Sequence, residues 1–230
     1  RLAGITGQVC PKMDSCRVAV FAADNGVVDE GVSCAPRSVT LQQAVNMTRR
    51  RTGMSAMAAA FGDDVAVVDV GIAADVPGVG ILDRKVRRGT GNIAVEDAMT
   101  RPEALAAMAA GMEQAARVRA DSITALGIGE MGIGNTSTSA AVLSALTGAD
   151  IEAVTGRGGG LTDEGFARKK DVLRRALTRR AVDKDDVLDV LCAVGGLDIA
   201  AMAGAFLGCA HERIPAAVDG FISVVAALCA

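Results

Sequence analysis

Residues 126–142 read LGIGEMGIGNTSTSAAV, an apolar run that passes through a glycine-rich turn into a segment of helical composition. The apolar run, which starts near residue 122, predicts a buried strand, and residues 136–146 predict the helix that follows it. Short runs of β-branched residues alternate with longer helical segments along the rest of the chain as well. This alternation predicts an α/β fold, in which helices cover both faces of a mostly parallel sheet.

The remaining elements follow from the same patterns. Three further strands are expected at residues 17–24, 64–71 and 216–220. Helices are expected at residues 41–60, 97–119 and 162–180, and in the final apolar run. The basic residues of the helix at 162–180 are interpreted as a mostly solvated face. No linker long enough to separate two full domains is visible, so residues 1–230 are expected to form a single α/β domain.

Two threonines indicate where helices begin, and one aspartate helps to interpret a long apolar stretch. Thr40 is predicted as the N-cap of the helix at 41–60, and Thr100 opens the next helix with a capping box and a proline in its first turn. Residues 193–210 are long and apolar, but they contain Asp198 and four glycines. We therefore interpret that stretch as a buried helix rather than a membrane span.

Composition narrows the class of partner. The chain has 230 residues, of which half are hydrophobic, a formal net charge of −3 at pH 7, and neither Trp nor Tyr. The negative charge argues against a nucleic-acid backbone as partner, and the scarcity of aromatic side chains leaves no platform on which bases could stack. A small soluble substrate is favoured.

Cysteine and histidine usage limits the chemistry. The six cysteines are scattered without a C-x-x-C pair and His211 is the single histidine, so no metal site is predicted. The thiols are interpreted as reduced, as in a cytoplasmic protein. A single histidine also disfavours a Ser-His-Asp or Cys-His mechanism, so acid–base chemistry must come from carboxylates.

Carboxylates stand where the predicted strands end. In a parallel sheet, ligands bind beyond the carboxyl ends of the strands. The strands end here at Asp24, Asp69, Glu130 and Asp219. Each is therefore expected to bring a carboxylate into that crevice.

The turn at residues 127–132 fits G-x-G-x-x-G, the dinucleotide-binding fingerprint, and Asp150 lies about twenty residues further on. Three features oppose an NAD site. Glu130 would repel a pyrophosphate, the loop continues as far as Thr136, and Asp150 precedes the next apolar run instead of ending it. A carboxylate in such a turn suits a neutral or cationic ligand with an N–H to donate, such as a heterocyclic base. An NAD oxidoreductase remains an alternative.

A second glycine cluster, TGRGGG at residues 155–160, follows shortly afterwards. Its four glycines expose main-chain N–H groups, Arg157 adds a positive charge, and the start of the next helix near Thr162 favours anions. These features predict a phosphate site, with a flexible surface loop as the alternative. The P-loop ending Gly-Lys-Ser/Thr is absent, so ATP hydrolysis gains no support.

Longer motifs now point to a family. GEMGIGNTS at residues 129–137 resembles the signature of the nicotinate-nucleotide–dimethylbenzimidazole phosphoribosyltransferases (the CobT family), which prepare the lower ligand of cobalamin. Other segments resemble the same family in the same order along nearly the whole chain. They are FAADNGVVDEGVS (21–33), VTLQQAVN (39–46), VVDVGI (67–72), KVRRGTGNI (85–93), AMT (98–100), GRGGGL (156–161) with RKK (168–170), VGGLDIAAMAG (194–204) and VDGFISVVAAL (218–228).

The resemblance implies a cytoplasmic, homodimeric enzyme with a Rossmann-like three-layer α/β domain and neither metal nor redox cofactor. It would transfer phosphoribosyl from nicotinate mononucleotide to dimethylbenzimidazole or a similar base, giving α-ribazole phosphate and nicotinate. A ring nitrogen of the base would attack the anomeric carbon from the face opposite the leaving nicotinate. The family's usual general base, a C-terminal Glu, is expected beyond Ala230, and the small helical subdomain is likewise expected outside residues 1–230.

Carried over residue by residue, the resemblance makes Glu130 the catalytic carboxylate beside the base. It also implies a set of substrate contacts. These are Ser33, Gln42 and Met131 at the base, Gly132, Gly134, Asn135 and Thr136 along the nucleotide, Arg157, Gly158, Gly159, Gly160 and Lys169 at the phosphate, and Asp219 at the ribose or nicotinate.

The chain departs from the family pattern at two places. Asn25 stands where the family usually has His, and Leu197-Asp198 stands where it usually has Phe-Glu. The second departure predicts a wider base pocket, and with it a preferred lower ligand other than dimethylbenzimidazole. The alternative to an enzyme is a non-catalytic protein of the same fold that captures a nucleotide or a benzimidazole.

Overall fold

The computed structural model describes residues 1–76, 78, 80–179 and 181–230, and Pro77, Val79 and Arg180 lie outside the described residues. A five-stranded sheet with the order β3-β2-β1-β4-β5 forms its centre, and every pair of neighbouring strands is parallel. The strands are β1 (Cys16–Ala23), β2 (Asp64–Gly71), β3 (Ile81–Asp83), β4 (Ala125–Met131) and β5 (Ala216–Ala217). The predicted α/β fold with a parallel sheet is confirmed.

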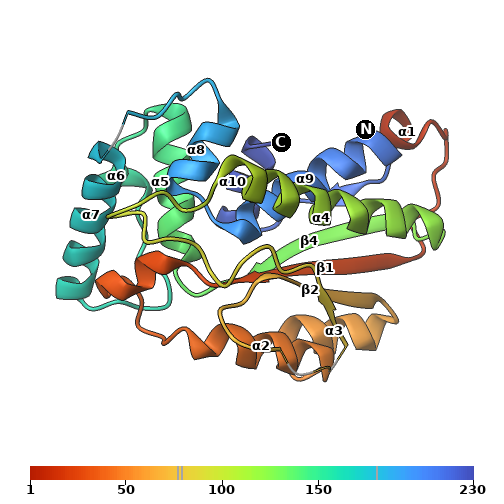
Figure 1. The fold of residues 1–230 in the computed structure, drawn as a ribbon. Coiled ribbons are helices and arrows are strands. Elements are labelled where there is room, and N and C mark those ends of the chain that lie inside the picture. Colours follow the sequence, from red (N-terminus) through yellow and green to blue (C-terminus); the bar gives the residue numbers. More distant parts are fainter. Residues whose placement is uncertain (77, 79, 180) are drawn as a thin grey trace.

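Helices form the two outer layers (Figure 1). The pair α2 (Ser38–Thr48) and α3 (Gly53–Phe61) covers one face of the sheet, and α4 (Arg101–Ala120) and α9 (Leu197–Glu212) cover the other. The remaining helices are α1 (Leu2–Thr6), the 3-10 helix Gly26–Glu30, α5 (Asn135–Thr147), α6 (Ile151–Val154), α7 (Asp163–Thr178), α8 (Val187–Val194) and α10 (Phe221–Leu228). The result is a three-layer sandwich, as the resemblance implies.

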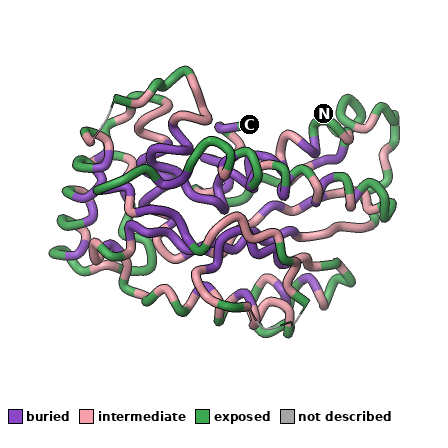
Figure 2. Tube along the Cα trace, viewed as in Figure 1, coloured by how far each residue is buried: buried purple, intermediate pink, exposed green. Residues whose placement is uncertain are grey.

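Strand register aligns the carboxyl ends of the central strands. Phe21 pairs with Val68 of β2 on one side and with Glu130 of β4 on the other. The last residues of β1, 19–23, are all buried, because parallel strands in the middle of a sheet are covered on both faces. Figure 2 shows this burial concentrated in the central strands and the helices packed on them. The strand-end carboxylates therefore share one edge of the sheet.

Glycines allow the helices of the α4–α9 layer to approach closely. A Cβ built on Gly204 of α9 would lie 2.0 Å from the carbonyl oxygen of Met108, and one on Gly111 of α4 would lie 1.8 Å from that of Ala201. Such distances leave no room for any side chain. The glycines at 204 and 111 therefore fix the depth at which α9 and α4 pack together on the sheet.

The predicted single helix at 41–60 is wrong, because the chain forms α2 and α3 with a break between them. Arg50 adopts a left-handed conformation (φ 58°) in the break, which ends the first helix. Thr40 is not the predicted N-cap, since α2 begins at Ser38 after Arg37, whereas Thr52 caps α3 and forms a capping box with Ser55. Thr40 lies inside α2, fully buried, and its hydroxyl accepts a hydrogen bond from the main chain of Ile133 at 3.1 Å.

Other boundaries shift by smaller amounts. The capping box of Thr100 with Glu103 is confirmed, so that helix begins at Arg101 rather than at residue 97. The strand expected at 216–220 covers only Ala216–Ala217. The helix expected at 162–180 is observed as Asp163–Thr178, capped by Thr162, and its last predicted residue, Arg180, lies outside the described residues.

The apolar stretch at 193–210 is divided between two helices. The end of α8 and the start of α9 are separated by Gly195 and Gly196, and most of α9 is buried against the sheet and α4. Asp198 is completely buried in its first turn. Within the described ranges, no helix is long and apolar enough to cross a membrane.

Candidate active site

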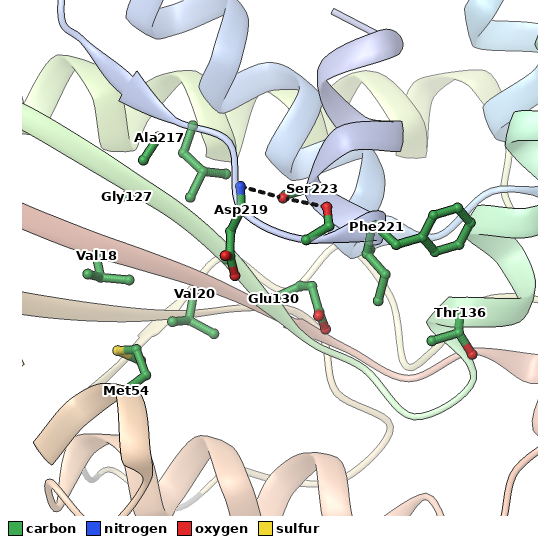
Figure 3. A pocket seen from close by; sticks show the side chains of 14 residues that line it. Val18, Val20, Met54, Gly127, Glu130, Thr136, Ala217, Asp219, Phe221 and Ser223 are labelled. Carbon is green, nitrogen blue, oxygen red and sulfur yellow. Dashed lines mark hydrogen bonds between the residues drawn. The ribbon is translucent and has the colours of Figure 1, made fainter. Parts of the chain in front are cut away.

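A pocket of about 520 Å³ opens on one face of the sheet beside the carboxyl end of β4 (Figure 3). Its walls are mainly apolar, and its polar groups come from β4, the start of α5 and the loop that leads into α10. The lining residues are Val18, Val20, Met54, Gly127, Ile128, Gly129, Glu130, Thr136, Ala217, Asp219, Gly220, Phe221, Ile222 and Ser223. A pocket of this size and character falls within the range of about 300–1,000 Å³ that is usual for small ligands.

Glycines of β4 keep the pocket open. A Cβ built on Gly129 would meet no atom within 4 Å, so a side chain there would occupy the pocket space itself. A Cβ on Gly127 would lie 3.3 Å from the side chain of Val18, in tight contact with β1. The strand therefore presents bare main chain to a ligand, as expected for a flat ring that lies against it.

Glu130 brings a carboxylate into this apolar space. One of its oxygens, Oε2, accepts a hydrogen bond of 2.5 Å from Nδ2 of Asn135. Burial raises the pKa of Glu130, and the nearby negative charge of Asp219 raises it further, against the lowering effects of hydrogen bonds from Asn135 and Gly132. A carboxylate with a raised pKa is a better acceptor for a proton near neutral pH.

Asp219 reaches the pocket from the opposite wall. Its main-chain N–H donates to Oγ of Ser223 at 3.0 Å, which anchors the loop at the start of α10. The hydroxyl of Ser223 in turn donates to the carbonyl of Gly220 at 2.9 Å. In Figure 3 the carboxylates of Asp219 and Glu130 both point into the pocket. Of the four strand-end acids predicted to enter the crevice, these two line the pocket. Asp24 and Asp69 do not, because both are buried, with Asp24 bonded to the main chain of Ala73 and Asp69 paired with Lys85.

Lys169 lies beside the pocket in a setting that is unusual for a lysine. The sequence assigned it to a mostly solvated basic face, but its side chain is fully buried. Its Nζ donates to Oγ1 of Thr136 at 2.9 Å and to the carbonyl oxygen of Gly156 at 3.0 Å. Both acceptors are neutral, and in the described part of the chain no salt bridge includes Lys169. Burial lowers its pKa to about 8.

The glycine loop at 156–160 lies over this amine. A Cβ on Gly158, which has a left-handed conformation (φ 55°), would lie 3.2 Å from Oγ1 of Thr136 and 3.8 Å from Nζ of Lys169. Thr136 also lies in the first turn of α5, whose N-terminus carries a partial positive charge. The ammonium, the hydroxyl and the helix N-terminus together favour an anion at this point.

Arg157 is placed differently from Lys169. Its guanidinium donates to Asp163 at 2.6 Å and to the carbonyl of Leu161 at 3.0 Å, and it stacks over the ring of Phe166 at 4.7 Å. Asp163 and Glu164 lie in the first turn of α7, the helix N-terminus at which the sequence predicts the phosphate. The geometry favours the start of α5 and Lys169 as the place for an anion, and the contact of Arg157 with phosphate stays a prediction.

The three side chains predicted at the base do not line the pocket. Ser33 accepts a hydrogen bond from the main chain of Ala35 at 3.2 Å, and Gln42 is exposed on α2. Met131 packs against a small apolar cluster between the sheet and α2. Their contacts with substrate stay predictions. The general base that the resemblance places beyond Ala230 is not among these 230 residues, so its role stays a prediction as well.

The glycines of the β4–α5 turn are needed by the turn itself. A Cβ on Gly132 would lie 2.5 Å from a carboxyl oxygen of Asp198, and Gly134 adopts φ 94° as the N-cap of α5. Gly159 and Gly160 are exposed in the second glycine loop. Contacts of these four glycines with a nucleotide also stay predictions.

The two departures from the family pattern lie beneath the pocket and not in its walls. Asn25 is buried and its Nδ2 donates to the carbonyl of Ile133 at 3.3 Å, so it ties the end of β1 to the β4–α5 turn. Leu197 and Asp198 are both fully buried. Neither lines the pocket, so the predicted widening of the base site finds no support in the lining residues.

Sequence reasoning missed the apolar walls. Val18 and Val20 share one face of β1, Met54 comes from α3, and Phe221 opens α10. The i, i+2 spacing of the valines was a usable signal, whereas nothing in the sequence connects Met54 with β4.

Among the described residues, no cluster of three or more His, Cys, Asp or Glu side chains could hold a metal ion.

Comparison with known proteins places this site in a family. The model of a family described as phosphoribosyltransferase matches residues 1–230. The nicotinate-nucleotide–dimethylbenzimidazole phosphoribosyltransferases of Clostridium perfringens and Acetivibrio thermocellus are 45% and 46% identical to the chain over all 230 residues. The chain spans 64% and 66% of their lengths, just under two thirds.

A solved structure agrees with these relatives. The crystal structure of CobT from Thermus thermophilus superposes with a TM-score of 0.94 at 42% identity, over 99% of this chain and 68% of that one. This chain therefore belongs to the nicotinate-nucleotide–dimethylbenzimidazole phosphoribosyltransferase family.

Proposed function

We propose that the protein transfers phosphoribosyl from nicotinate mononucleotide to dimethylbenzimidazole or a similar base, releasing nicotinate and forming α-ribazole phosphate. Family membership supports this activity. One observation in the structure carries it: Thr136 lines the pocket that contains Glu130, and its hydroxyl lies 2.9 Å from the buried amine of Lys169. This contact supports a site for a ring with an N–H beside a site for an anion.

In this proposal the phosphate of the mononucleotide binds at Lys169, Thr136 and the main chain of Gly158. The ammonium has only neutral acceptors, so a phosphate supplies the negative charge that its buried position lacks. The N–H groups at the start of α5 add hydrogen bonds to the same anion. The ribose then extends from this anchor toward Glu130 and the pocket.

The benzimidazole lies in the apolar pocket, with its N–H directed at the carboxylate of Glu130. The lone pair of its other ring nitrogen attacks the anomeric carbon and forms the new C–N bond. The C–N bond to nicotinate breaks, and its electron pair returns to the pyridinium ring, which leaves as neutral pyridine. The ring N–H proton passes to a carboxylate. The protein's part is to hold the two rings in line and to accept that proton.

Asp219 is proposed to stabilise the ribose or the cationic pyridinium of the substrate. Its negative charge also keeps the pKa of Glu130 raised. We further propose a cytoplasmic homodimer, which rests on the family resemblance alone. Light scattering of the purified protein would test the assembly.

The test is the reaction itself. Because the resemblance assigns the usual general base to a segment that these 230 residues do not contain, the complete gene product is incubated with nicotinate mononucleotide and dimethylbenzimidazole. Mass spectrometry is expected to detect α-ribazole phosphate, and Glu130→Gln is expected to slow its formation while the protein stays folded. No product with any benzimidazole, purine or phenolic acceptor contradicts the proposal. Binding of both ligands without turnover indicates a capture protein instead.

A further inference from the structure

A buried amide joins two carboxyl groups beneath the pocket. Nδ2 of Asn135 donates to Oε2 of Glu130 at 2.5 Å and to Oδ2 of Asp198 at 2.9 Å. Asn135 is 4% exposed and Asp198 is 0% exposed. Because both partners are carboxyl oxygens, the amide nitrogen and not its oxygen must face them. Both amide hydrogens are therefore used inside the protein.

Asp198 is held rigidly at the far end of this bridge. Its Oδ1 accepts a hydrogen bond from the main chain of Ile199 at 3.0 Å, in the first turn of α9. A Cβ on Gly132 or Gly196 would lie 2.5 or 2.4 Å from its carboxyl oxygens, so two stretches of bare main chain enclose the group. The carboxyl therefore has little freedom to turn away from Asn135.

Packing alone does not explain a carboxyl group at this position. A buried carboxyl group without a cationic partner is unfavourable, and a neutral side chain of similar size would be accommodated more easily. Burial and the charge of Glu130 raise the pKa of Asp198 to about 7, which shows how poorly its charge is compensated. Its carboxyl group binds Asn135, which also binds Glu130, so it can influence the position of Glu130.

We propose that Asp198 is a positioning residue, which acts through Asn135 to hold the carboxylate of Glu130 in the orientation that receives the N–H of the base. Asp198 fixes the plane of the Asn135 amide, and that amide fixes one oxygen of Glu130. The amide nitrogen of Asn135 then serves this bridge, and contact of Asn135 with the nucleotide stays a prediction. This inference rests on the proposed transferase function.

The test uses steady-state kinetics of the complete gene product with nicotinate mononucleotide and dimethylbenzimidazole. Asp198→Asn is expected to lower kcat about tenfold or more, because small misplacement of a catalytic group is costly, and to leave KM for the mononucleotide within twofold. In the Glu130→Gln background, Asp198→Asn is expected to cause no further loss. A residue that acts only on stability would instead lower the rate by the same factor in both backgrounds.

Two further variants complete the design. Asn135→Ser removes the bridge but keeps Asp198, and is expected to reproduce the loss in kcat, so the test survives if the Asp198 variant does not fold. Leu197→Val is the matched packing control, since it alters an equally buried neighbour without touching the bridge, and its kcat is expected to stay unchanged. Wild-type kcat in Asp198→Asn or Asn135→Ser overturns the inference, as does a loss that multiplies with Glu130→Gln. An inactive wild type instead overturns the proposed function.

Discussion

Replacing Lys169 with methionine is expected to stabilise the unliganded protein and to remove its affinity for phosphate. The amine is fully buried with two neutral acceptors, and its pKa falls from 10.5 to about 8 on folding. This pKa difference of about 2.5 means that the charged amine destabilises the folded protein by about 3 kcal/mol at pH 7. Methionine has a similar length and no charge, so it avoids this penalty.

The gain is partly offset by lost hydrogen bonds. The bonds to Thr136 and Gly156 contribute about 1 kcal/mol each, so a net stabilisation of about 1 kcal/mol remains. For a chain of this size, that corresponds to a rise of about 2–4 °C in Tm. The stability difference between the variant and the wild type depends on pH, because the folded wild type binds fewer protons than its unfolded chain between pH 8 and 10.5. Wild-type stability should therefore rise over that range relative to the methionine variant, and the advantage of the variant should disappear.

The assay is urea unfolding of the complete gene product, wild type and Lys169→Met, under reducing conditions at pH 7 and at pH 10. The difference between the two proteins is the quantity of interest, because cysteines and other groups titrate equally in both. Added inorganic phosphate is expected to stabilise only the wild type. A variant that is less stable than the wild type at pH 7, with a difference that does not change with pH, refutes the view that Lys169 carries an uncompensated charge for a ligand.

Three further outcomes are expected. Asp219→Asn removes a charge that raises the pKa of Glu130, so the acidic limb of the pH profile of kcat/KM should move to lower pH. An acidic limb at the same pH in the variant would show that this limb does not report the titration of Glu130. Gly204→Ala places a Cβ 2.0 Å from a carbonyl of α4 and should lower the free energy of unfolding by about 3 kcal/mol, whereas Gly4→Ala, which meets nothing within 4 Å, should change it little. Folding raises the pKa of Asp198 from 3.8 to about 7, so the stabilisation by its protonated form is present below about pH 4 and is lost as the pH rises to 7. Asp198→Asn should therefore remove up to about 4 kcal/mol of the pH dependence of the unfolding free energy. Equal pH slopes of that free energy in the wild type and the variant would contradict this.

Much of the fold was predictable because local signals and tertiary packing agree. The apolar runs of β1, β2 and β4 lie where the sequence predicts strands, and Thr100 caps α4 as its capping box indicates. The break between α2 and α3 was missed because helical composition continues through it. The bond from Ile133 to Thr40 is a tertiary contact that no local pattern encodes. Left-handed Arg50 is instead accompanied by local main-chain bonds that close α2, and Thr52 caps α3 through Ser55 three residues further on.

The site was predictable in part for a related reason. Strand ends and glycine turns are visible in a sequence, so Glu130, Thr136 and Asp219 could be placed near one another. The charge pattern placed Lys169 on a solvated basic face, because composition does not reveal which side of a helix is buried, and only the family resemblance assigned it to the phosphate. The bridge from Asn135 to Asp198 joins residues 63 positions apart, and only the folded chain brings them together.

Two adjoining sites are proposed to hold the two ligands, a base at Glu130 and a phosphate at Lys169. Calorimetric titration of the complete gene product with dimethylbenzimidazole and with inorganic phosphate, on the wild type and on Glu130→Ala and Lys169→Met, tests it most directly. We predict that Glu130→Ala weakens the base at least tenfold and leaves phosphate unchanged, and that Lys169→Met does the reverse. If each variant weakens both ligands equally, or leaves its own ligand unaffected, the protein does not have these two separate sites.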